Sequence, residues 1–418
     1  MKNNKTLLLV LIIAFLFIVT IAIVVIVALP NKNSNTPINI ISNTDAPVEN
    51  KEETNTNDIK DTFVKEEITA KVQKGEIAKE RSLYVDEENK TAVIPEGYGV
   101  VKDATTIKNG LVISDREDDD MNNTKDGNQF VWVPIEVPIL DVSKYTTDNQ
   151  INSALQKQAN EGKYPMAIRL SDGNYEGVLY DFAAIRENTV ISITPATYGT
   201  GATRKEPSNV TADKDTTTYQ GEFNKLILRI RNDSGFWIAR YETSLDEQNN
   251  IAQSKKDKVV LTNKNWYDLY NIEKTLSNEN VSSHMIWGCQ WDQIMIWMKD
   301  VNNIYGQKNR FYILDSTNKG NYSDLEIRDS DNKVIKKGGE AIRYGSAFNE
   351  IFATKNIYDL AGNVFEWTME SYYNSLRVVR GGYCAYDGQT YPVSSRFWFQ
   401  PEYSGERLVN IGSRMTIY

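Results

Sequence analysis

Histidine and cysteine are almost absent from this sequence. Its 418 residues include one histidine, His284, and two cysteines, Cys289 and Cys384. A single histidine excludes on count any metal centre built from a histidine cluster, and a serine triad centred on it has no support. Walker, G-x-S-x-G and H-E-x-x-H patterns are also missing. We therefore expect His284 to cap or pack, and the two cysteines to be either a disulfide pair or buried thiols.

An excess of basic residues is missing as well. The chain has 47 Lys and Arg against 56 Asp and Glu, which gives a formal net charge of -9. Such a chain has no surplus of cations to neutralise a phosphate backbone. Nucleic acid is therefore not an expected partner.

One long apolar run stands out in a chain whose mean hydropathy is -0.48. Residues 6–29 carry no charge and would form roughly 36 Å of helix, enough to span a bilayer. Lys2 and Lys5 precede the run, so the positive-inside rule predicts a single-pass protein of the cell membrane with a cytoplasmic N-terminus and an extracellular head. The alternative is a cleaved signal peptide, whose apolar run is usually shorter. No cysteine directly follows the run, which excludes a lipoprotein anchor.

Composition divides the chain into three parts. Residues 1–30 are the expected anchor, and residues 31–90, rich in Asn, Thr, Asp, Glu and Lys, are expected to form a flexible stalk with a marginal helix over 62–81. The remaining residues, 91–418, form the expected head.

Periodicity within the head predicts an α+β fold. Strands are expected over 127–135, 235–244 and 376–383, where β-branched and aromatic residues cluster. Helices are expected over 265–276 and 291–298, and a long loop over 193–221. The pattern is one of short strands, two helices and long loops, without βαβ alternation.

The stretch YDLAGNVFEWT, residues 358–368, places one carboxylate, Glu366, between Phe365 and Trp367. Together with RVVRGGY, SSRFW and NIGSR further along, it resembles the formylglycine-generating-enzyme, or sulfatase-modifying-factor, domain. The resemblance covers residues 130–418, is strongest over 357–382, and implies a variant of the C-type lectin fold. GNQFVWVPI, residues 127–135, resembles phage and Firmicute surface members of this superfamily rather than its enzymes.

In the resembled family the G-N-x-x-E stretch forms a calcium site. Calcium prefers six to eight oxygen ligands, so the resemblance implies a structural calcium held by Asn363, Val364 and Glu366. A bound cation would let Glu366 lie among aromatic rings without the penalty of an unpaired buried charge. The alternative is an ion pair between Glu366 and an arginine such as Arg380 or Arg396.

The family's enzymes bind copper with two nearby cysteines after the R-G-G-S-Y strand. Here that segment supplies only Cys384, and Cys289 is far away in sequence. Because soft copper needs paired thiolates, we expect no copper and no catalysis. The competing hypothesis is a formylglycine-generating-type oxidase, or a related modifying enzyme, with an altered site at Cys384.

What remains is ligand binding. Residues 383–406 are rich in Tyr, Phe, Trp, Ser and Gly, the residues that antibody-like binding surfaces use. Neighbours on a strand alternate faces, so the three consecutive rings at 397–399 cannot all point inward. The alternative is that the rings cover the core. The candidate contact residues are Tyr383, Tyr386, Tyr391, Phe397, Trp398, Phe399 and Tyr403.

The sequence therefore predicts a non-catalytic, membrane-anchored surface protein that binds an extracellular protein or glycan. One branch of the resembled family diversifies its C-terminal segment with a retroelement, and such a display protein is an alternative here. The motif NIGSR departs from that pattern, because the family usually has Phe where this chain has Ser413. A purely structural envelope or phage-derived component is a further alternative.

Overall fold

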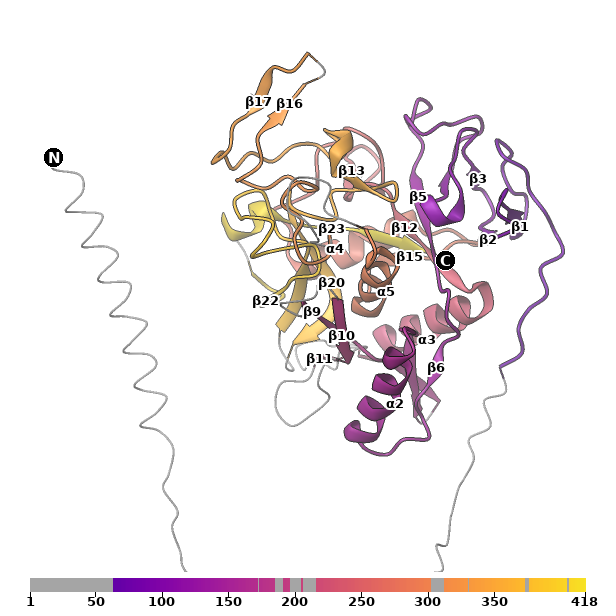
Figure 1. Cartoon of the computed structure of the whole chain (residues 1–418). Helices are drawn as coiled ribbons and strands as arrows, with labels where there is room; N and C mark the ends of the chain where they lie inside the picture. Colours follow the sequence, from indigo (N-terminus) through magenta and orange to yellow (C-terminus); the bar gives the residue numbers. More distant parts are fainter. Residues whose placement is uncertain are drawn as a thin grey trace, which may run out of the picture. The chain divides into compact units, whose positions relative to one another are not determined.

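Strands, helices and connecting segments of the head are visible in the computed structural model of the protein (Figure 1). The described residues are 63–171, 173–184, 191–195, 204–205, 216–301, 312–329, 331–372, 376–403 and 406–418. The predicted anchor at residues 6–29 lies outside these residues. Within the described ranges, no helix combines the length and the apolar character that a bilayer span requires.

A six-stranded sheet forms one layer of the head. Its central strands, β5 and β12, pair antiparallel, with Trp237 opposite Trp132. Both strands are buried on both faces, which explains why their sequences are continuous apolar runs rather than alternating ones. In spatial order the strands are β15 (Ser283–Met285), β24 (Met415–Ile417), β12 (Gly235–Ala239), β5 (Gln129–Pro134), β4 (Val112–Ser114) and β3 (Gly99–Val100).

A second, five-stranded sheet carries the motifs at the C-terminal end of the chain. Its long strand β20 contains FEWT of the 358–368 stretch and pairs antiparallel with β21 and parallel with β23. The parallel pairing places Ile411 beside Phe365, 46 residues earlier in the chain, a separation given by 411 − 365. The strands are β11 (Arg204–Lys205), β20 (Phe365–Tyr372), β21 (Leu376–Arg380), β22 (Arg396–Phe399) and β23 (Ile411–Ser413).

Helix α5 (Gly288–Met298) packs against strands of both sheets, β5 and β20. Ten of its eleven residues are buried, including the polar Gln290, Asp292 and Gln293. Helix α4 (Trp266–Glu273), extended by the 3-10 turn η2 (Lys274–Leu276), begins at the capping residue Asn265. These two helices confirm the predicted ones at 265–276 and 291–298.

Two further helices were not predicted. Helix α2 (Asp148–Asn160) has few apolar residues, and its start is fixed by a capping box between Thr147 and Gln150. Helix α3 (Thr216–Asp233) begins inside the predicted loop at 193–221, and strands β10 (Ile191–Pro195) and β11 (Arg204–Lys205) also overlap it, so the loop prediction is wrong at all three. The α+β class is nevertheless confirmed.

Short pieces complete the described head. Five small sheets have two strands each: β1 (Ser82–Val85) with β2 (Thr91–Ile94), β9 (Tyr180–Ala184) with β10 (Ile191–Pro195), β13 (Ser244–Asp246) with β14 (Ile251–Gln253), β16 (Ile327–Arg328) with β17 (Val334–Lys336), and β18 (Ala353–Thr354) with β19 (Ile357–Tyr358). One further sheet has three strands: β6 (Leu140–Asp141), β7 (Ala167–Ser171) and β8 (Asn174–Gly177). The 3-10 turns are η1 (Ile107–Asn109), η3 (Glu350–Phe352) and η4 (Glu406–Asn410).

The head begins earlier than composition predicted. Residues Phe63–Tyr418 form one compact unit, so the stretch 63–90 belongs to the head and not to a stalk. No helix is present over the described residues 63–81; instead Val72 and Ala78 are buried and strand β1 pairs with β2. Composition averaged over sixty residues hid these few apolar positions. Glu66 is also fixed to helix α3, because its backbone N–H donates to Asn232 Oδ1 at 2.8 Å.

Candidate functional site

A pair of glycines turns the chain sharply after strand β21. Gly381 and Gly382 both have positive φ, 89° and 76°. A Cβ on Gly382 would lie 2.5 Å from the carbonyl oxygen of Tyr391, so only glycine fits this close approach. The buried Tyr322 hydroxyl lies 2.9 Å from Gly381 O and 2.7 Å from Tyr391 O, which ties the turn to the loop above it. The turn directs Tyr383 and Tyr386 back over Phe365 in strand β20.

Strand β22 supplies the next rings. Phe397 and Phe399 point to the side of the sheet where Phe365 lies, with ring centroids 6.1 and 6.5 Å from it. Trp398 points to the other side, where it stacks on Tyr372 at 5.5 Å and 14°. The alternation of neighbouring strand residues thus separates Trp398 from its two neighbours, and half of Trp398 stays exposed.

The rings form a continuous cluster on one side of the second sheet. Tyr383 lies 4.4 Å from Tyr386, which stacks on Tyr391 at 4.1 Å and 19°. Phe399 lies 5.9 Å from Tyr403, which adds Tyr403 to the cluster. The cluster therefore contains six of the seven predicted contact residues, all except Trp398. Burial is the largest cause that raises the pKa of Tyr383 to about 12, with Tyr386 adding to it, so its hydroxyl stays a neutral donor.

The cluster surrounds a cleft of about 450 Å³, which we call the aromatic cleft. Its lining residues are Phe365, Tyr383, Tyr386, Phe397, Phe399, Asn410 and Ile411. Four of them were predicted from sequence. Tyr391 contacts Tyr386 and Tyr403 contacts Phe399, but neither is a lining residue, and Trp398 also lies outside the lining.

Sequence reasoning missed Phe365, Asn410 and Ile411. Phe365 had a usable signal, because it lies two residues from Trp367 in the same strand and therefore shares its face. Asn410 and Ile411 had none, because only the parallel pairing of β23 with β20 brings them beside Phe365.

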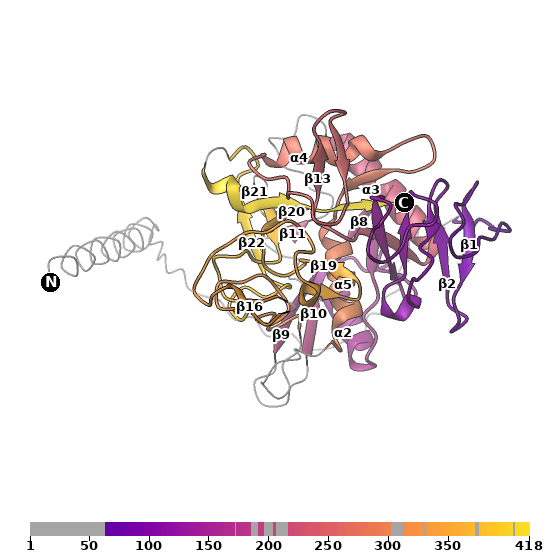
Figure 2. The ribbon, with the colours of Figure 1, turned by 90° about the horizontal axis from the view of Figure 1, so that it is seen from above.

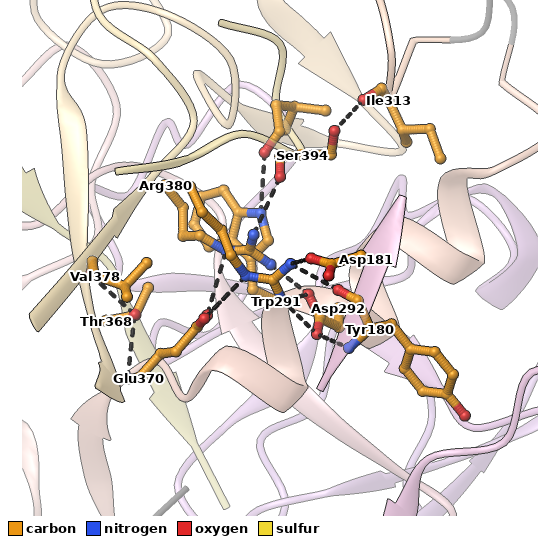
Figure 3. A network of polar contacts seen from close by, with 12 residues as sticks. Tyr180, Asp181, Trp291, Asp292, Ile313, Thr368, Glu370, Val378, Arg380 and Ser394 are labelled. Carbon is orange, nitrogen blue, oxygen red and sulfur yellow. Dashed lines mark hydrogen bonds and ion pairs between the residues drawn. The ribbon is translucent and has the colours of Figure 1, made fainter. Parts of the chain in front are cut away.

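A buried ionic network surrounds Asp292 of helix α5, with Glu370 and Arg380 beside it (Figure 3), and Arg396 joins strand β22 to this network and to strand β9. Arg396 binds both carboxylate oxygens of Asp292 at 2.7 Å, and its Nε lies 2.9 Å from Glu370 Oε1. Arg380 also pairs with Asp292, and Arg396 Nη1 donates to Tyr180 O at 2.6 Å. Although burial opposes it, the carboxylates of Asp292 and Glu370 raise the pKa of Arg396, which therefore stays charged. The network holds Phe397, the next residue, in place at the cleft.

Glu366, the carboxylate between two aromatics, is bound by an arginine. Arg414 Nη2 donates to Glu366 Oε1 at 2.6 Å and Arg414 Nε donates to Oε2 at 3.0 Å, with both side chains fully buried. The alternative partners named from sequence, Arg380 and Arg396, bind Asp292 instead. Glu366 is the backbone partner of Arg380 in the sheet, but its side chain meets Arg414.

The predicted calcium ligands Asn363 and Val364 are buried beside Glu366. Asn363 Oδ1 accepts from Asn321 Nδ2 and from the backbone N–H of Tyr344, both at 3.0 Å, and its Nδ2 donates to Glu242 Oε2 at 2.6 Å. No group of three or more His, Cys, Asp or Glu among the described residues is placed to hold a metal. Protein partners already occupy the Asn363 amide and the Glu366 carboxylate, so a calcium ion would have to displace them.

The cysteines and the histidine are not among the residues that line the cleft, although Cys384 follows the lining residue Tyr383. Cys289 and Cys384 are both buried, and no disulfide joins them. Burial is the largest cause that raises the pKa of the Cys384 thiol, which favours the unreactive protonated form. Burial also lowers the pKa of His284 to about 4, and its Nδ1 lies 2.8 Å from Met285 O. These features agree with structural roles.

Comparison with known proteins gives weak likenesses. No family model matches the sequence, and no curated protein matches it. Among solved structures, PvdO from Pseudomonas aeruginosa is 15% identical with a TM-score of 0.29, over 44% of this chain and 81% of that chain. Treponema denticola variable protein 1 is 12% identical with a TM-score of 0.31, over 60% of this chain and 97% of that chain. TM-scores this low decide neither fold nor function.

Proposed function

We propose that this protein is a non-catalytic ligand-binding protein whose head presents the aromatic cleft to an extracellular protein or glycan. The observation that carries the proposal is the convergence of five aromatic rings from β20, β22 and the loop after β21 on one open cleft of about 450 Å³. Ligand sites are typically concave, mostly apolar and of this size. Phe397 is 38% exposed although a soluble domain usually buries such a ring, so a binding partner gives its position a reason.

The proposal includes a sulfatase-modifying-factor-like head with a C-type lectin-like scaffold, anchored by residues 6–29. Support comes from the motifs at 357–382 and from the α+β architecture. Strand β22 lies at the opposite end of the head from strand β1 in both views (Figures 1 and 2). Glu66, near the start of the head, forms an ion pair with Arg81 just before β1, so the chain enters far from the cleft.

The alternative of a copper oxidase is less well supported. It requires paired thiolates, and the segment after strand β21 supplies only Cys384. The alternative of a retroelement-diversified display protein uses the same cleft and differs only in how its residues vary. A structural calcium at Asn363, Val364 and Glu366 stays a prediction that competes with the Arg414 ion pair for Glu366, and no copper is expected.

The experiment is a screen of the full chain, held in lipid nanodiscs, against arrays of oligosaccharides and of peptides. We expect ligands to be captured and to be lost with a variant carrying Tyr386→Ala and Phe399→Ala, which removes two walls of the cleft. Circular dichroism of that variant checks that it is folded. Capture that survives the double change would refute the proposal, and copper-dependent oxygen consumption lost with Cys384→Ser would favour the oxidase.

A further inference from the structure

A projecting hairpin places one lysine inside the head. Strands β16 and β17 pair antiparallel and extend away from the rest of the head (Figure 1). Ile335 of β17 is exposed, but Lys336, the last residue of this strand, is fully buried. Among the described side chains, no carboxylate forms an ion pair with its amino group. A buried amino group has lost its bonds to water, so it needs acceptors from the protein.

The acceptors of Lys336 lie in a segment without regular secondary structure. Its Nζ donates to Tyr322 O at 2.5 Å and to Leu325 O at 2.8 Å. Residues 322–325, which we call the 322–325 segment, form neither helix nor strand. Because no ladder of backbone hydrogen bonds fixes this segment, its conformation depends on individual donors such as Lys336.

The 322–325 segment in turn holds the loop that carries the cleft tyrosines. Ser323 donates twice to Tyr386 O, from its backbone N–H at 2.9 Å and from its Oγ at 3.0 Å. The buried Tyr322 hydroxyl lies between Gly381 O and Tyr391 O, at 2.9 and 2.7 Å. These contacts fix the loop at both of its ends and at a residue that lines the aromatic cleft.

From this series of contacts we propose that Lys336 is a positioning residue of the ligand site, an inference that rests on the proposed function. Its amino group fixes the 322–325 segment, and Tyr322 and Ser323 fix the loop 381–391 to that segment. The loop then presents its tyrosines to a ligand in one conformation, which lowers the entropy cost of binding. Lys336 acts on the cleft in this way without contacting the ligand.

Hydrogen exchange of the full chain in lipid nanodiscs, followed by mass spectrometry, tests this role without any ligand. Lys336→Met keeps an unbranched side chain and removes its donors. We expect the amides of 381–391 to exchange about tenfold faster, because the loop loses its support, while those of β5 and β12 keep their rates. Lys74→Met is the matched control, since Lys74 Nζ donates to Ala104 O at 2.8 Å, and it should leave 381–391 unchanged.

A double variant tests whether Lys336 acts through the 322–325 segment. Lys336→Met combined with Tyr322→Phe should exchange at 381–391 no faster than the stronger single variant, because both changes release the same loop. Ser323→Ala is milder, since it removes one of two bonds to Tyr386 O, and it should raise exchange there by a smaller factor. Additive effects, no rise at 381–391, or an equal rise in β5 and β12 would each overturn the inference.

Ligand binding separates this inference from the proposed function. An oligosaccharide or peptide captured on the arrays should bind Lys336→Met about fivefold more weakly than the wild type, and Lys74→Met equally well. Faster exchange at 381–391 with unchanged binding would refute the proposed function at this cleft and leave the support of the loop by Lys336 standing. Unchanged exchange, with binding still lost in the Tyr386→Ala and Phe399→Ala double variant, would overturn the inference and leave the proposed function standing.

Discussion

Replacing Arg414 with methionine should strongly destabilise the head. The guanidinium makes three contacts with Glu366, at 3.1, 3.0 and 2.6 Å, and donates to Tyr358 O at 2.8 Å and Ala239 O at 3.1 Å. Both charged side chains are fully buried. Methionine has a similar volume but no charge and no donors, so it leaves the carboxylate and two carbonyls without their partner.

The expected magnitude follows from the loss of one member of a buried ion pair. Such a loss costs about 3–5 kcal/mol, because the remaining charge is uncompensated. At about 2–4 °C per kcal/mol for a large domain, Tm should fall by about 6–20 °C. Arg414 also faces Asp359, whose pKa burial raises to about 6, so the loss of Arg414 leaves that carboxylate without its cation as well.

The assay is urea and thermal unfolding followed by circular dichroism. The double variant Glu366→Leu with Arg414→Met, in which neither charge is present, should recover much of the lost stability. Arg328→Met, which breaks the exposed pair with Glu326, should change little.

A small effect of Arg414→Met, together with a large drop in Tm on adding a calcium chelator, would refute this reasoning. Calcium rather than Arg414 would then neutralise Glu366. Full stability without the arginine and without calcium would show that the buried carboxylate is protonated.

Three further predictions concern the same head. Burial raises the pKa of Glu273 to about 8 from 4.5, so the folded state holds this proton more tightly than the unfolded state. The free energy of unfolding should therefore fall as pH rises from about 4.5 to about 8. Glu273→Gln should flatten that slope in urea unfolding. Tyr322→Phe removes the hydroxyl that bonds to Tyr391 O and Gly381 O; Gly381 O keeps the backbone N–H of Gly362, so the loss of the Tyr391 bond should cost about 1–3 kcal/mol in the same assay. Gly382→Ala should destabilise far more than Gly339→Ala, because both have positive φ but only Gly382 has backbone atoms within reach of a new Cβ; equal effects in thermal unfolding would contradict this.

Sequence patterns predicted the elements whose apolar residues form a clear run or helical period. Strands β5, β12 and β21 and helices α4 and α5 have apolar residues at the spacing that each structure requires. Helix α2 was missed because its residues are mostly polar and its start depends on one capping box. The pairing of β1 with β2 was missed because short strands leave little signal in a polar segment.

At the candidate site, the sequence predicted most residues of the aromatic cluster but not all of the side chains that they contact. Because neighbouring residues of a strand alternate between its two faces, the sequence predicted that Phe397 and Trp398 lie on opposite faces of the sheet. The partner of Glu366 could not be foretold, because Arg380 lies opposite it in the sheet yet reaches Asp292 on helix α5. Arg414 comes from the end of the chain, and only the packed tertiary structure brings it to Glu366.

The most direct test of the aromatic cleft compares two neighbouring residues. The dissociation constant of a captured ligand should be measured for the wild type, for Phe397→Ala and for Trp398→Ala. Both rings are exposed and adjacent in strand β22, but only Phe397 lines the cleft. We predict that Phe397→Ala weakens binding by about tenfold or more while Trp398→Ala leaves it nearly unchanged. Equal losses, or a loss confined to Trp398→Ala, would contradict the claim that ligands bind in this cleft.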